Sequence, residues 1–223
     1  LAKLLAYAQR DDFFGRGTIS QDPIDRAFGL SALVAVLNKS YPTDHNYVMN
    51  VVLPLLDAHY REEERRLKEI PKEFEEKKAS GEVVELEVKQ RGKKLKVVLV
   101  CSESPSLAGY LRSSIGGKYD VVLQRAKSGY TNILTRPAKH IDLRDLTALI
   151  RANEAHKRGI ELDAPYHELT RPGRHPKIKE WYYDRATNSV QNGGLNPSGV
   201  EPTRITWEDF KKILPEGLAG LSS

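Results

Sequence analysis

The sequence predicts an α/β fold: a helical N-terminal segment, a long connecting helix, and a C-terminal mixed-sheet domain with a βαβ unit and hairpins. Apolar residues recur at helical spacing through the first part of the chain. A stretch dense in Glu, Lys and Arg follows, and beyond it short apolar runs alternate with turns. These patterns predict two domains, residues 1–80 and residues 81–223.

The composition favours an ordinary folded protein. Of its 223 residues, 39% are hydrophobic and 29% are charged, which is typical of globular domains. The single cysteine excludes an internal disulfide framework and suits a reducing cytoplasm. No apolar stretch approaches the about 20 residues of a membrane span, and no secretory leader is evident. We therefore expect a cytoplasmic protein without a membrane partner. Its net charge of +5 favours an anionic partner.

The first 80 residues are expected to be helical. Apolar side chains at helical spacing are Leu30, Leu33, Val34, Leu37, Val48, Val51, Val52, Leu55 and Leu56. Thr43-Asp44 can cap a helix that begins at His45. From Asp57 to Lys78 acidic and basic residues alternate, which indicates a long solvated helix with i,i+4 ion pairs. A nucleic-acid-binding face is the alternative for this helix.

The second domain begins with strands. The expected elements are a hairpin over Glu82–Val100, a short helix after Leu107, a strand over 119–124, a strand over 130–135, a helix over 142–157, a hairpin over 181–191 and a final helix over 206–214. Strand, helix and strand over 95–124 form the βαβ unit. Residues 159–178, rich in Pro, Gly, Arg and His, are expected to form a long loop, and such loops are usually functional or mobile.

Polar residues gather along the strand over 130–135 and at its exit. Ser128 precedes the strand, Thr135-Arg136 ends it, and His140 follows. Alternation places Asn132 and Leu134 on one face of the strand and Thr131, Ile133 and Thr135 on the other. A guanidinium at a strand end suits a phosphate or carboxylate, because it binds oxyanions through two N–H groups. The alternative for Arg136 is a surface arginine before a proline.

A second cationic group lies in the long loop. Arg171, Arg174 and His175 stand close before the aromatic run Trp181-Tyr182-Tyr183. Cations beside aromatic rings suit a nucleotide or single-stranded nucleic acid, whose bases stack on rings while arginines meet phosphates. The alternative is a solvated loop next to core aromatic residues.

Asp11-Asp12 near the start is the candidate for metal chemistry. Hard divalent ions prefer carboxylate oxygens, so either residue can supply one ligand. The alternative is that the pair and Gly15 form a turn that ends a helix. The six histidines show no compact ligand spacing.

The order of these elements resembles the later part of a DHH-superfamily phosphoesterase and its accessory substrate-binding domain. The resemblance covers residues 1–156. It rests on Arg10-Asp11-Asp12, the charged helix, the Glu82–Val100 hairpin, and the unit with Ser128-Gly129 and Thr135-Arg136; Asp142–Asp145 stands where the next helix of that domain begins. The Asp-His-His triplet and the Gly-Gly-Gly-His loop of the family are absent from this sequence.

The resemblance implies metal-dependent hydrolysis of a phosphoester in a nucleotide or short oligonucleotide, with manganese or magnesium as the cofactor. It implies that the principal metal-binding strands lie upstream of Leu1, that Asp11 or Asp12 is a late metal ligand, and that this chain supplies mainly substrate recognition. The residues expected to bind substrate are Ser128, Thr135, Arg136, His140, Arg171, Arg174 and His175. The alternative is a non-catalytic nucleotide- or RNA-binding module, and homodimerisation through the charged helix is left open.

Overall fold

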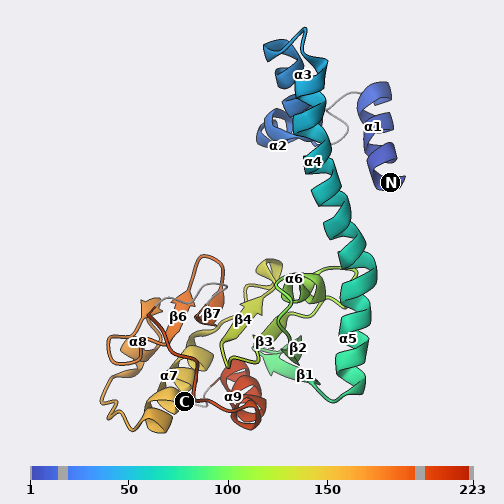
Figure 1. The fold of residues 1–223 in the computed structure, drawn as a ribbon. Helices are drawn as coiled ribbons and strands as arrows, with labels where there is room; N and C mark the ends of the chain where they lie inside the picture. Colours follow the sequence, from blue (N-terminus) through green and yellow to red (C-terminus); the bar gives the residue numbers. More distant parts are fainter. Residues whose placement is uncertain (1, 15–19, 194–198, 221–223) are drawn as a thin grey trace. The chain divides into compact units, whose positions relative to one another are not determined.

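The computed structural model describes residues 2–14, 20–193 and 199–220, which divide into two compact units, Leu1–Leu67 and Lys68–Ser223. The first unit is helical and the second is built on a mixed sheet, so the predicted α/β class is confirmed (Figure 1). The unit boundary lies earlier than residue 80 because the last helix before the sheet packs on the sheet itself: Ile70 and Phe74 are buried with Val98 and Val122.

The first unit comprises α1 (Ala2–Phe14), α2 (Pro23–Phe28), α3 (Leu30–Ser40) and α4 (His45–Glu64). Carboxylates cap two of these helices. The Asp22 Oδ1 accepts a hydrogen bond from the Ile24 N at 2.7 Å, and the Asp44 Oδ1 accepts one from the Tyr47 N at 2.9 Å. The second cap is the one that the sequence predicts. Among the described residues of this unit, the only hydrophobic side chains that are buried belong to Ala32 and Val48.

The charged stretch forms the end of α4, a π-helical segment η2 (Arg65–Glu69) and α5 (Ile70–Ala79). Pro71 lies in the first turn of α5 and has no N–H to donate, which accounts for irregular helical hydrogen bonding just before it. The Arg61–Asp57 pair at 2.8 Å and the Lys72–Glu76 pair at 3.7 Å are i,i+4 ion pairs of the predicted kind. No helix in the described ranges combines the length and apolar character that a membrane span needs.

The second unit contains a seven-stranded sheet in the order β1-β2-β3-β4-β7-β6-β5. The strands are β1 (Val83–Gln90), β2 (Lys93–Cys101), β3 (Val121–Arg125), β4 (Thr131–Thr135), β5 (Gly173–Arg174), β6 (Trp181–Asp184) and β7 (Ser189–Asn192). Among the strand pairs that the structure describes, only β2 and β3 are parallel; they are joined through the helix α6 (Leu107–Arg112), which makes the predicted βαβ unit. The hairpins β1–β2, β3–β4 and β6–β7 are antiparallel, also as predicted.

Two hydrophobic cores lie on opposite faces of this sheet. The larger one joins α7 (Arg144–Arg158) and α9 (Trp207–Ala219) to side chains such as Leu123, Ile133 and Val190. The smaller one joins α5 and α6 to Val98 and Val122 (Figure 1). The long loop predicted over 159–178 also contains a one-turn helix, α8 (Tyr166–Leu169), and the short strand β5. A 3-10 turn, η3 (Pro137–Lys139), follows β4.

Candidate functional site

A line of polar side chains crosses the sheet from β3 to β5. The register pairs Gln124 with Asn132, Asn132 with Gln191, Gln191 with Tyr182, and Tyr182 with Arg174. Residues directly opposite each other on neighbouring strands project from the same face. We call these five residues the polar row. The residues next to them in each strand, such as Leu123 and Ile133, face the larger core.

The polar row lies on the less covered face of the sheet. The core beneath α5 and α6 takes in side chains of β2 and β3 and reaches Leu134 of β4. Farther across the sheet, the side chains of this face are partly accessible: Asn132 and Gln191 are half-buried, and Tyr182 is 43% exposed. Within the described part of this unit, one face is therefore packed by helices throughout, while the other is accessible over β4, β7 and β6.

Asp120 and Arg136 continue this face at the far end of β3 and β4. The Arg136 N donates to the Asp120 carbonyl at 2.9 Å, and the Arg136 Nη2 forms an ion pair of 2.9 Å with the Asp120 Oδ1. The Lys139 Nζ lies 3.8 Å from the same oxygen. The Asp120 side chain is only 5% exposed, and its Oδ2 accepts a hydrogen bond from the Lys96 N at 3.0 Å.

Other cationic residues lie on the segments next to Asp120 and Arg136. The Arg112 Nη1 donates to the Thr135 carbonyl at 2.6 Å, and the Lys96 Nζ reaches the Gly117 carbonyl at 3.4 Å, next to Lys118. We call Lys96, Arg112, Lys118, Arg136 and Lys139 the basic end of the face. The carboxylate of Glu85, on β1, is paired with Lys78 at 2.5 Å and also interacts with the charge of Lys96. Positive charge at the basic end therefore exceeds what Asp120 neutralises.

Burial makes part of this charge poorly solvated. Desolvation lowers the pKa of the Arg112 guanidinium below its usual range. At the basic end, the Arg136 Nε and the Asp120 Oδ1 are buried atoms without a hydrogen-bond partner, the latter having only its ion-pair contacts. On the polar row, the Asn132 Oδ1 is another such atom. Each such atom costs about 1–3 kcal/mol unless a ligand or ordered water satisfies it. The face therefore carries an unsatisfied polar group both at its basic end and on the polar row.

Three predicted site residues lie around the exit of β4. Arg136 belongs to the basic end. The Thr135 hydroxyl is buried on the opposite face, where it donates to the Asn188 carbonyl at 2.7 Å and accepts from the Asn188 Nδ2 at 3.1 Å. His140 is exposed directly after η3, with φ 48° and ψ 50° in the left-handed region. Of these three, Arg136 is the residue whose side chain the structure directs onto the polar face.

The remaining predicted site residues are spread over the unit. Ser128 is exposed in the β3–β4 turn, at the opposite end of these strands from Arg136. Arg171 is exposed after α8, and Arg174 belongs to the polar row. His175 is only 3% exposed. The structure thus brings Arg136 and Arg174 onto one face, whereas Ser128 and His175 lie elsewhere.

The buried His175 makes stability depend on pH. Its Nδ1 accepts a hydrogen bond from the Lys177 N at 3.3 Å. Desolvation lowers the pKa of His175 below its ordinary 6.5. The positive charges of Arg151, Arg171 and Lys177 lower it further, and the charge of Glu168 opposes them. In the window between that lowered pKa and 6.5, the unfolded chain binds more protons than the folded one, so stability falls as the pH decreases.

We expect the melting temperature to fall between about pH 7.5 and 5.5, and His175→Asn to reduce this fall. Asparagine can still accept the Lys177 hydrogen bond but does not titrate. Melting curves followed by circular dichroism measure both proteins. The control is His140→Asn, an exposed site, which should keep the wild-type pH dependence. Identical pH profiles for His175→Asn and the wild type would contradict the assignment.

The predicted metal ligands lie near the end of α1. The Asp11 Oδ1 is buried without a hydrogen-bond partner, and Asp12 is exposed. Gly15, the possible turn residue after them, lies outside the described residues. In the ranges that the structure describes, no three His, Cys, Asp or Glu residues group as metal ligands. One carboxylate oxygen does not fit a two-metal centre by itself, so we derive no catalytic step from these residues.

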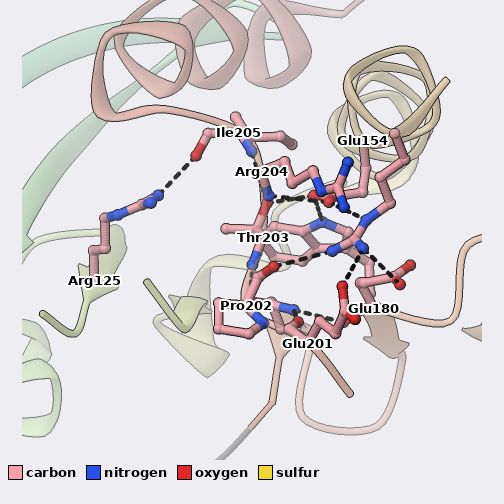
Figure 2. A network of polar contacts seen from close by, with 11 residues as sticks. Arg125, Glu154, Glu180, Glu201, Pro202, Thr203, Arg204 and Ile205 are labelled. Atoms are coloured by element: carbon pink, nitrogen blue, oxygen red, sulfur yellow. Dashed lines mark hydrogen bonds and ion pairs between the residues drawn. The ribbon is translucent and has the colours of Figure 1, made fainter. Parts of the chain in front are cut away.

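A polar network around the buried Glu154 holds the start of the aromatic strand β6 (Figure 2). Glu154 of α7 accepts hydrogen bonds from the Trp181 Nε1 at 2.9 Å, the Arg204 N at 3.0 Å and the Thr203 Oγ1. The Arg158 Nε also donates to Glu154, at 2.6 Å. The network fixes the start of β6 and the segment around Thr203 against α7, and thereby fixes the backbone that carries Tyr182.

The accessible face, with its polar row and basic end, is the candidate functional site. It contains two of the predicted residues, Arg136 and Arg174, and adds others that sequence reasoning did not select. These are Gln191 on the row and Arg112 and Lys139 at the basic end. The sequence patterns already include Gln124, Asn132 and Tyr182, as polar strand residues and as part of the aromatic run, but not among the residues expected to bind substrate. No protein-family model, curated protein or solved structure matches this chain.

Proposed function

We propose that this chain binds a nucleotide or short single-stranded nucleic acid on the accessible sheet face, with a phosphate held at the basic end. The observation that carries the proposal is the excess of cations around Asp120, together with the buried, unpartnered Arg136 Nε. A phosphate offers several acceptor oxygens, and a guanidinium can meet two of them at once.

Asp120 has two opposing effects in this proposal. It orients Arg136 through the 2.9 Å ion pair, but its charge repels an incoming phosphate. Lys139 contacts the same carboxylate at the longer distance of 3.8 Å, and its flexible side chain can turn towards a ligand. Removing the charge of Asp120 and removing the charge of Lys139 should therefore change phosphate affinity in opposite directions.

The test uses fluorescence anisotropy with a short fluorescein-labelled oligoadenylate. Lys139→Gln should weaken binding and reduce the slope of log affinity against log salt by about 0.7, the value for one lost phosphate contact on a single strand. Asp120→Asn keeps an oxygen that can accept from the Lys96 N. It should strengthen binding about threefold to tenfold, because it relieves roughly 1 kcal/mol of repulsion.

Lys212→Gln is the matched control, since Lys212 is an exposed lysine on α9. Equal weakening by Lys139→Gln and Lys212→Gln would show diffuse attraction to the whole basic protein and would refute the basic end as a site. Weaker binding by a folded Asp120→Asn protein would also contradict the proposal. Circular dichroism melts establish that each variant is folded before binding is compared.

Phosphoester hydrolysis, implied by the DHH-superfamily resemblance, is the second candidate. The unpartnered Asp11 Oδ1 beside Asp12 favours it, and in that case this chain supplies mainly substrate recognition.

The test incubates the oligoadenylate with the protein and manganese. Release of mononucleotides by the wild type, and its loss in Asp11→Asn, would support hydrolysis. Binding with no release would favour the binding module. Homodimerisation stays a prediction that sedimentation would test. The cytoplasmic location also stays a prediction.

A further inference from the structure

The polar row differs from an ordinary solvated sheet face in its composition. Accessible faces of antiparallel sheets are usually polar, so polarity alone indicates no ligand. Here, however, the half-buried residues that lie opposite one another on three neighbouring strands are side-chain amides, Gln124, Asn132 and Gln191, and the next strand presents Tyr182. Amides offer both a donor and an acceptor, which suits the edges of nucleobases.

The orientation of these amides is partly fixed. The Gln124 Nε2 donates to the carbonyls of Ser102 at 3.0 Å and Ser104 at 2.8 Å. Both N–H groups of Gln124 are thus engaged, so its Oε1 is the atom that can accept from a ligand. The Gln191 Nε2 donates to the Ser189 Oγ at 2.7 Å.

Asn132, between the two glutamines, has a buried Oδ1 without a hydrogen-bond partner. Its terminal torsion has a broad, roughly two-fold preference, so the amide can rotate to present either its oxygen or its N–H groups outward. A ligand with complementary donors and acceptors can therefore satisfy an atom that the protein leaves unsatisfied.

Tyr182 supplies an aromatic surface in line with the amides. It is 43% exposed, while its neighbours Trp181 and Tyr183 are buried on the other face. Base–aromatic stacking tolerates every base because each base has a π-face. The backbone of Tyr182 is held by the Glu154 network, since Glu154 binds the adjacent Trp181, so this ring is carried on a rigid strand.

We infer that the polar row is a nucleobase subsite, in which Tyr182 stacks on a base and the row amides bind base edges. This inference rests on the proposed function and extends it from the phosphate to the base. Asn132 and Arg136 lie on the same face of one extended segment. Their Cα atoms are four residues apart along the strand, or about 13 Å at 3.3 Å per residue. That spacing suits a ligand whose bases and phosphates are separated by sugars.

The occupant is a nucleotide or single strand for two reasons. The three amides and Tyr182 lie on strands that are paired on both sides, so their backbone groups are already used and cannot pair with an added peptide strand; within the row, Arg174 alone lies on the edge strand β5. The cations at the basic end favour phosphate over a neutral ligand. An unpaired strand can present base faces and edges to the row, whereas in a duplex the bases are stacked and paired.

The test compares Tyr182→Leu, Tyr182→Phe and the control Tyr60→Leu, since Tyr60 is a tyrosine of α4 with the same exposed fraction, 43%. The probes are the labelled oligoadenylate and, as an unlabelled competitor, inorganic tripolyphosphate. Tyr182→Leu should weaken oligoadenylate binding about 5- to 150-fold and leave tripolyphosphate competition unchanged. Tyr182→Phe and Tyr60→Leu should bind like the wild type. Asn132→Leu should reduce the preference among oligonucleotides of different bases.

The outcomes separate this inference from the proposed function. If Lys139→Gln weakens oligoadenylate binding but Tyr182→Leu does not, the base subsite is refuted and the phosphate proposal stands. If Tyr182→Leu weakens both probes equally, the ring supports the protein rather than a base, and the inference fails again. If neither probe binds the wild-type chain, both proposals are overturned. Finding that a single nucleotide competes as well as the oligoadenylate would identify a mononucleotide as the ligand.

Discussion

Replacing Glu154 by alanine should lower the free energy of unfolding by about 3–5 kcal/mol, the cost of breaking a buried ion pair from one side. Glu154 is fully buried, with a relative exposure of 0%. Its carboxylate accepts from the Arg158 Nε, the Trp181 Nε1, the Thr203 Oγ1 and the Arg204 N. Alanine would leave these donors buried without an acceptor, and Arg158 without the partner on its Nε.

Glu154→Gln should fall between alanine and the wild type. One amide oxygen still accepts, but the NH₂ group faces donors that require an acceptor. Urea denaturation followed by tryptophan fluorescence is a suitable measurement, because the Trp181 Nε1 donates directly to Glu154. The control Glu208→Gln changes a carboxylate that is 71% exposed and paired with Lys211, and should alter stability by at most about 0.5 kcal/mol. An effect below about 1 kcal/mol for Glu154→Ala would contradict the importance of the network.

The elements that the sequence predicts well are those fixed by nearby residues. The β3–β4 hairpin follows from two apolar runs around Lys127–Gly129, and the βαβ unit follows from β2, α6 and β3 in direct succession. Strand alternation by itself also separates Asn132 from Ile133. Alternation, however, equally puts Thr135 on the face of Ile133. The hydroxyl of Thr135 is therefore buried, where it forms hydrogen bonds with Asn188 instead of binding a ligand.

The site itself depends on pairing between distant residues. Asn132 meets Gln191 because β7 inserts beside β4, and local patterns do not indicate which distant strand a strand pairs with. Lys139 and Arg112 look like ordinary surface cations in the sequence, since their positions near Asp120 and Thr135 arise only in the folded unit. The polar row and the basic end thus could not be assembled from spacing alone.

Arg151 should be the second position of large effect. Its side chain is fully buried in α7, and its guanidinium donates to the carbonyls of Leu169 at 2.8 Å, Arg171 at 2.9 Å and Gly173 at 2.5 Å. These bonds go to carbonyls of the segment that leads into β5. Burial lowers the pKa of Arg151 to about 10, so the group stays charged at neutral pH and its carbonyl contacts are charge-assisted.

Arg151→Met should therefore loosen residues 168–175 and destabilise the protein by about 3 kcal/mol, since buried carbonyls without a donor cost about 1–3 kcal/mol each. Arg151→Lys should recover little of this, because an ammonium cannot reproduce the planar fork that reaches several carbonyls. Hydrogen exchange measured by mass spectrometry would show faster exchange in this segment than elsewhere. The control is Arg144→Met, a mostly exposed arginine of the same helix.

The consequence for binding follows from the position of Arg174. It lies in β5, directly after the carbonyl of Gly173 that Arg151 holds. Under the proposed function, loosening this segment should displace Arg174 on the polar row, weaken oligonucleotide binding and leave the contribution of Lys139 intact, so Arg151→Met and Lys139→Gln should reduce binding additively. Unchanged exchange over residues 168–175 in Arg151→Met would mean that other groups hold these carbonyls, and Arg174 would then be positioned by its pairing with Tyr182 alone.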